Sequence, residues 1–145
     1  MITRINMVIL MQHDLTAAID FYEKLGLKKV FSLEGKWAEL ELGSIKIGLC
    51  PQAGEQPEVR TGIVFEASDI QAFYDQYKGQ FNFKGELIEK VHGKMISLVD
   101  PGHNVIDLYQ PTPEKLKDLI KKVKGKDESV GCPKGDTCCK KEPVA

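Results

Sequence analysis

Apolar and polar positions follow the same order of patterns twice along this chain. A run of strand-like alternation at residues 2–12 is followed by an Asp and then by apolar residues at helical spacing, DLTAAIDFY at 14–22. The same order returns from residue 61, where the helical segment reads DIQAFYDQY at 69–77. Asp14 and Asp69 are of the residue type that begins helices as N-caps, and Gly26 suits the end of the first helix.

Three further strand-like runs follow each predicted helix. They lie at residues 28–33, 36–42 and 44–50, and again at 82–90, 94–99 and 104–110, with short turns between them. Residues 51–60 contain two prolines and a glycine without an apolar period, so they are predicted to link the two halves. The chain therefore contains two copies of one strand, helix, strand, strand, strand unit. We expect the first strand, which is apolar on both faces, to be buried on both sides.

A third helix is predicted at residues 113–124, because Pro113 suits a first helical position. Its apolar residues form a narrow stripe, and they are Leu116, Leu119, Ile120 and Val123. Lysines dominate its last turns, where they complement the negative end of the helix dipole. We expect this helix to dock on the rest of the domain, in preference to forming a basic surface for membranes or nucleic acid.

The segment DPGHNVIDLYQ at 100–110 combines a turn with a strand that carries an acid into the domain. Asp100 and Pro101 favour the turn, and alternation then places Asp107 on one face with Val105 and Tyr109. A carboxylate among apolar neighbours needs a partner or a ligand. Asp107 is therefore either a general base or a buried carboxylate paired with Tyr109 or a lysine.

Several of these segments resemble the vicinal oxygen chelate superfamily, which includes glyoxalase I, extradiol dioxygenases, fosfomycin-resistance enzymes and bleomycin-resistance proteins. The resemblance is carried by DLTAAIDFY, by LGL at 25–27, by FEASDIQAFY and by DPGHNVIDLY. It implies an α+β fold in which two βαβββ modules, at about 2–50 and 61–110, form a partly open barrel around a ligand cavity. With the third helix, the glyoxalase/bleomycin-resistance-like domain is expected to span residues 1–124. The superfamily commonly pairs modules within or between chains, so a homodimer is expected.

Metal-dependent members of that superfamily take one ligand from the first and last strand of each module. The positions that correspond here are Met7, Gly48, Gly62 and Asp107, and only Asp107 offers an oxygen suited to a divalent ion. The sequence therefore predicts no metal in the barrel and no cofactor. His103 stands where the family's turn usually has glycine.

The cavity is expected to be largely apolar, with two glycine recesses and a few acids, as is usual for small-molecule sites. Alternation turns Trp37 and Glu39 toward it, because Ala38, Leu40 and Leu42 suit the helices. The other expected lining residues are Met7, Ile9, Met11, Gly48, Cys50, Gly62, Val64, Glu66, Asp107 and Tyr109.

Composition limits the partners. The chain has 145 residues, 42% of them hydrophobic, and a net charge of −1, which fits one domain without the basic field of nucleic-acid binders. Its longest apolar run is too short to cross a membrane, so a cytoplasmic protein is expected. Residues 125–145 have little apolar content and are expected to be disordered, although Cys132, Cys138 and Cys139 could hold a soft metal.

Three functions remain open at this stage. The sequence favours a metal-independent protein that binds an apolar or aromatic small molecule in the cavity. The second possibility is a glyoxalase-like lyase or isomerase, or a dioxygenase-related enzyme, that uses Asp107 or Glu66. The third is handling of a soft metal or metalloid by the thiols near the C-terminus.

Overall fold

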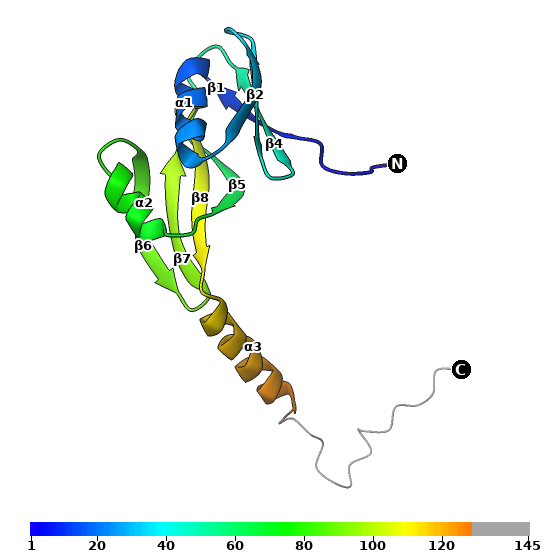
Figure 1. The fold of residues 1–145 in the computed structure, drawn as a ribbon, viewed down its shortest axis with the longest axis vertical. Coiled ribbons are helices and arrows are strands. Elements are labelled where there is room, and N and C mark those ends of the chain that lie inside the picture. Colours follow the sequence, from blue (N-terminus) through cyan, green and yellow to red (C-terminus); the bar gives the residue numbers. More distant parts are fainter. Residues whose placement is uncertain (129–145) are drawn as a thin grey trace.

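Two four-stranded sheets with the same strand order form the body of the protein. The structure is a computed structural model and describes residues 1–128. The first sheet has the order β1-β4-β3-β2 and the second β5-β8-β7-β6 (Figure 1). The strands are β1 (Val8–Gln12), β2 (Lys28–Leu33), β3 (Trp37–Leu42), β4 (Ile45–Pro51), β5 (Val59–Glu66), β6 (Asn82–Lys90), β7 (Gly93–Val99) and β8 (Asn104–Pro111). The predicted α+β class and the internal repeat of two βαβββ modules are thereby confirmed.

Each module has one helix, and an aspartate caps the N-terminus of each helix. Helix α1 (Leu15–Leu25) follows β1, and α2 (Ile70–Tyr77) follows β5. Asp14 accepts a hydrogen bond from Ala17 N at 3.1 Å, and Asp69 accepts one from Ala72 N at 3.0 Å, which confirms both as N-caps. α1 ends at Gly26, whose φ of 106° is left-handed and is tolerated best by glycine.

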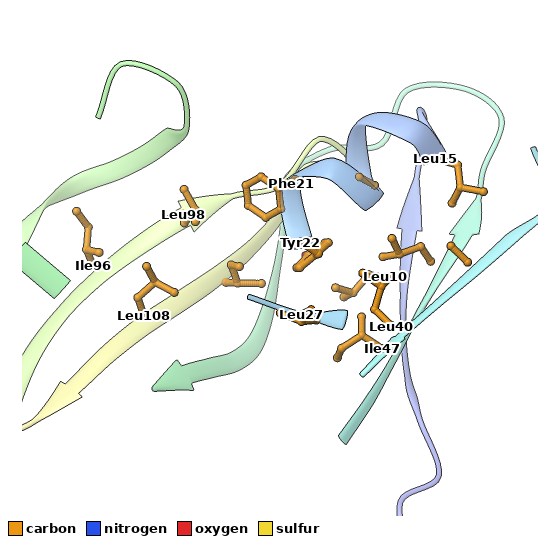
Figure 2. Close-up of a cluster of buried hydrophobic side chains, with 14 of the residues drawn as sticks. Leu10, Leu15, Phe21, Tyr22, Leu27, Leu40, Ile47, Ile96, Leu98 and Leu108 are labelled. Carbon is orange, nitrogen blue, oxygen red and sulfur yellow. The ribbon is translucent and has the colours of Figure 1, made fainter. Parts of the chain in front are cut away.

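The hydrophobic core runs from the first sheet through α1 to the second sheet (Figure 2). Leu10, Leu40 and Ile47 bring side chains from three neighbouring strands to the face that α1 covers. Phe21 of α1 reaches Phe81, the residue just before β6, with the ring centroids 5.0 Å apart. Helix α1 is therefore shared by both modules, and burial of its apolar face joins them into one unit.

The opposite faces of the two sheets are open. The sheets are not closed into a barrel, and side chains on these faces remain exposed, such as Ile9 at 53% and Val64 at 52%. The expectation that the first strand is buried on both sides was wrong, because only its Leu10 and Gln12 side is buried. That strand also begins at Val8 rather than at residue 2. Residues 1–128 thus leave the outer faces of both sheets uncovered, and each face carries exposed apolar side chains.

Helix α3 (Pro113–Glu128) does not dock on the domain, which corrects the prediction made from its apolar stripe. It projects from the end of β8, away from both sheets (Figure 1). The exposed fractions of its apolar side chains are 36% for Leu116, 38% for Leu119, 44% for Ile120 and 55% for Val123. An ion pair of 3.1 Å between Lys115 and Glu89 of β6 connects its base to the second sheet.

A buried polar cluster fixes the position of one module relative to the other. The Asp100 carboxylate accepts hydrogen bonds from Gln12 Nε2 and from the Tyr22 hydroxyl, both at 2.7 Å. It also accepts the backbone N–H groups of Gly102 and Asn104, each at 2.8 Å. Burial, together with the adjacent Asp100 carboxylate, raises the pKa of Tyr22 far above its ordinary value, so this hydroxyl keeps its proton and remains a donor.

The linker between the modules is fastened to the turn after β7. His103 Nδ1 lies 2.6 Å from the Gln56 carbonyl oxygen, and Gln56 N–H donates to His13 Nε2 at 3.2 Å. His103 has φ 64°, the left-handed region that side chains other than glycine rarely occupy. The hydrogen bond to the linker offsets this strain, which explains how the turn is kept without the family's glycine.

Substitutions of His103 should separate backbone strain from the linker contact. His103→Ala keeps a side chain at positive φ but removes the hydrogen bond, and we expect it to lower the free energy of unfolding by about 1–2 kcal/mol. His103→Gly removes the strain as well and should cost less. Urea unfolding of both variants measures the difference. Equal losses for the two would show that the strain has no energetic weight.

Candidate functional site

The open face of the first sheet gathers most of the predicted lining residues of its module. Pairing of the strands places Ile9 beside Gly48 and Gly48 beside Glu39, so the three share one face in a row. Met11 pairs with Cys50 on the same face. These residues alternate with the buried positions that face α1.

Trp37 forms the centre of this face. A Cβ atom at Gly48 would lie 2.5 Å from Trp37 Cη2 and 2.8 Å from Met7 Sδ. Gly48 therefore does not leave the empty recess that the sequence suggested, because the indole ring and the Met7 thioether occupy it. The indole ring therefore lies against the backbone of β4 at Gly48 and gives this face an aromatic surface.

Glu39 brings a carboxylate next to this aromatic surface. Its side chain is 11% exposed, and Glu39 Oε1 lies 3.2 Å from Lys46 Nζ on the neighbouring strand. The partner is needed because an unpaired carboxylate at this depth would lose its hydration. The face is therefore apolar and aromatic, with one neutralised acid.

The open face of the second sheet is centred on Asp107. Ser97 donates its hydroxyl to Asp107 Oδ1 at 2.6 Å, and Arg60 Nη2 lies 3.3 Å from Oδ2. Asp107 was expected to pair with Tyr109 or a lysine, if it was paired at all, and the structure gives it Ser97 and Arg60 instead. Both carboxylate oxygens are engaged, which suits a fixed negative charge more than a free general base.

Of the other residues predicted for this face, some lie on it and one lies in an irregularity of β5. Val64 pairs with Asp107 and Glu66 with Tyr109, so all four share the face. Gly62 lies in an irregularity between Arg60 and Val64, where its φ of 74° explains the glycine. Its role is therefore to shape β5.

Tyr109 is held by the turn between β6 and β7. Its hydroxyl donates to the His92 carbonyl oxygen at 2.7 Å and lies 3.1 Å from His92 Nδ1. A Cβ at Gly93 would come within 2.6 Å of the Tyr109 ring, so the ring packs directly on that turn. Tyr109 lies on the open face, but its hydroxyl is already hydrogen-bonded to the His92 carbonyl oxygen.

Arg60 and Ser97 belong to the candidate site although sequence reasoning did not select them. The turn at 100–104 fixes the β7–β8 register, so that Val99 faces Val105 and Ser97 faces Asp107. That register was a usable signal for Ser97. Arg60 was obscured by the irregularity in β5, which makes the alternation uncertain at its start.

A pocket of about 160 Å³ lies over Asp107, and all of its lining residues belong to the second sheet. Six of them are Arg60, Lys84, Glu86, Ile88, Met95 and Ser97. The structure therefore brings the predicted residues together as two separate sets, one on each sheet. Val64 and Glu66 also line a pocket of about 290 Å³ with Val8 and Ile47 of the first sheet, but no predicted lining residue of the first module takes part in it.

The side chains do not fit the metal centre that the superfamily resemblance implies. Gly48 and Gly62 offer no side-chain ligand, Met7 offers only a thioether beside Gly48, and Asp107 is paired with Arg60. Among residues 1–128, no group of three or more His, Cys, Asp or Glu side chains is placed to hold a metal ion. The cysteines at 132, 138 and 139 lie outside these residues.

The described helices include none that is both long and apolar enough to cross a membrane.

Residues 4–108 match the model of the Glyoxalase/Bleomycin resistance protein/Dioxygenase superfamily. No curated protein matches the chain.

Three solved structures illustrate the similarity of fold. The fosfomycin resistance protein FosX from Listeria monocytogenes is 17% identical with TM-score 0.67, covering 82% of this chain and 99% of its own. The antibiotic binding protein TnmS3 from Streptomyces sp. CB03234 is 22% identical with TM-score 0.59, covering 77% of this chain and 98% of its own. A bleomycin-binding protein complexed with bleomycin is 24% identical with TM-score 0.56, covering 76% of this chain and 100% of its own.

Proposed function

Because the chain belongs to the Glyoxalase/Bleomycin resistance protein/Dioxygenase superfamily, we propose that it binds an apolar or aromatic small molecule without a metal. We propose further that two copies form the site together. In this arrangement, the Trp37 face of one copy covers the Asp107 face of the other. The binding of bleomycin by one protein of similar fold, and of an antibiotic by another, supports the ligand class.

The observation that carries the proposal is the exposure of two corresponding faces, one on each sheet. Ile9 and Val64 occupy corresponding places in the two modules, beside Gly48 and Asp107, and both are about half exposed. Leaving such apolar surface in water costs roughly 25 cal/mol per Å². A second copy removes that cost while leaving room between the faces for a ligand.

Cationic side chains beside the two acids support binding without a metal. Lys46 lies beside Glu39, and Arg60 lies beside Asp107, at 3.2 and 3.3 Å. Glu39 and Asp107, the largely buried acids of the two faces, therefore each have a positive partner already. An incoming divalent ion would have to displace these partners and would gain only two carboxylates, which is too few to hold it against water.

Titration with Nile red, a neutral aromatic dye, tests this function. Trp37 is the only tryptophan in the chain, so energy transfer from it reports binding at this face. We expect saturable binding by a dimer, with an affinity that changes less than twofold when Mn(II) is added. Absence of saturable binding would contradict the ligand class, and a requirement for Mn(II) would contradict metal independence. A monomer at micromolar concentration by sedimentation would contradict the shared site.

A further inference from the structure

Helix α3 has an apolar stripe that no other described residue covers. Leu116, Leu119, Ile120 and Val123 lie within about 100° of one another around the helix, since each residue advances roughly 100°. Each remains between 36% and 55% exposed. Because α3 projects beyond the sheets, this stripe is free to meet a surface outside the module pair (Figure 1).

Lysines border the stripe on both sides. On the helical projection, Lys117 and Lys124 lie on one side of it and Lys115 and Lys122 on the other, each roughly 90–110° from its centre. The acids Glu114 and Asp118 lie on the opposite side of the helix, together with Lys121. Lys115 pairs with the exposed Glu89 and lowers its pKa, so three flanking lysines have no ion pair among the described residues.

This distribution disfavours a second copy of α3 as the partner. If two such helices met along their stripes, in parallel or antiparallel, the lysine borders of one would face those of the other, and like charges repel. The area is also small, because four partly exposed aliphatic side chains cannot supply the roughly 800 Å² per partner of a stable interface. The flanking charges require an acidic partner that is flat enough to accept one stripe.

We propose that α3 docks on an anionic lipid surface, with the stripe in the boundary between head groups and acyl chains and the flanking lysines on the head groups. A helix of low mean hydropathy with one apolar stripe and a basic border is the type that lies in this plane without spanning the bilayer. The acids on the opposite side would then face water. The surface concerned is separate from the ligand site, so the proposal does not depend on the proposed function.

Sedimentation of the full chain with vesicles tests this docking. We expect binding to vesicles of phosphatidylglycerol and phosphatidylcholine in equal parts, little binding to pure phosphatidylcholine, and release in 0.5 M NaCl. Replacing both Lys117 and Lys124 with Gln should weaken binding more than tenfold, because each basic residue near such a surface contributes about fivefold. Leu119→Gln with Ile120→Gln should weaken it similarly.

Matched controls separate docking from a general charge effect. Lys28→Gln with Lys29→Gln on β2 makes the same change in net charge away from α3 and should leave vesicle binding within twofold. Glu114→Gln with Asp118→Asn should bind at least as well as the unaltered chain. All variants should keep the circular dichroism and the sedimentation mass of the unaltered chain, since the altered side chains are exposed.

Four results would overturn the proposal. The first is no binding to anionic vesicles at low salt, and the second is equal loss from the β2 and α3 lysine pairs. The third is a change of oligomeric state on substitution of Leu119 and Ile120, which would make the stripe a contact between copies. Capture of an acidic protein by α3, without vesicle binding, would likewise replace the lipid surface with a protein partner.

Discussion

Replacing Asp100 with Ala is expected to lower the free energy of unfolding by about 3–5 kcal/mol, a large part of the total for a domain of this size. The side chain is 3% exposed and accepts hydrogen bonds from both modules. Its removal leaves Gln12 and Tyr22 buried without their acceptor, in addition to the two N–H groups of the turn. Urea unfolding followed by circular dichroism measures the loss.

Two variants show whether the effect comes from the junction of the modules. Tyr22→Phe removes one donor and keeps the ring, so it should cost about 1.5–3 kcal/mol, the range for hydrogen bonds to charged groups. Asp14→Ala removes an aspartate of the same size from an exposed helix cap and should cost only about 1 kcal/mol. A loss for Asp100→Ala no greater than that for Asp14→Ala would mean that the cluster does not fix the modules.

Gly48→Val is expected to displace Trp37 and abolish ligand binding. Even one added carbon at Gly48 would lie 2.5 Å from the indole ring, closer than such atoms approach in proteins, so the ring must move. Overpacking of this kind typically costs 1–3 kcal/mol. The emission of Trp37 should shift to longer wavelength as the ring enters water, and saturable Nile red binding should be lost, because the aromatic surface is lost.

Gly79→Ala is the matched control for that variant. Nothing lies within 4 Å of a Cβ at Gly79, and its φ is not in the left-handed region. Emission and dye affinity should therefore stay as in the unaltered chain. Unchanged Trp37 emission in Gly48→Val would show that the ring does not rest on Gly48.

The sequence predicted the repeat because each copy carries the same local signals. Asp14 and Asp69 begin the helices in both sequence and structure, and the alternation in β3 correctly turned Ala38 and Leu40 inward. These features depend on contacts within one element or between neighbouring elements, and such contacts leave a periodic pattern of apolar residues in the sequence. The periodic pattern did not show where α3 lies relative to the two sheets. An apolar stripe shows that a helix has something to cover, but not whether the cover comes from its own chain.

The sequence predicted which face of the sheet each candidate residue occupies better than it predicted which side chains these residues contact. Alternation placed Glu39, Val64 and Asp107 on the open faces, as the strand pairing now shows. It gave no information on partners from other strands, so Lys46 beside Glu39 and Ser97 beside Asp107 were missed. Such partners depend on the register between strands, which turn lengths and irregularities set.

Mixing two variants tests the shared site most directly. Gly48→Val blocks the first-sheet face, and Val64→Lys places a charge on the second-sheet face at an exposed position. Each variant alone should sediment as a dimer and bind no Nile red. In a mixed dimer, the intact first sheet of one copy meets the intact second sheet of the other. After equal mixing and exchange, about a quarter of the sites should therefore bind the dye, given random pairing. No recovery despite mixed dimers would contradict a site built from two copies.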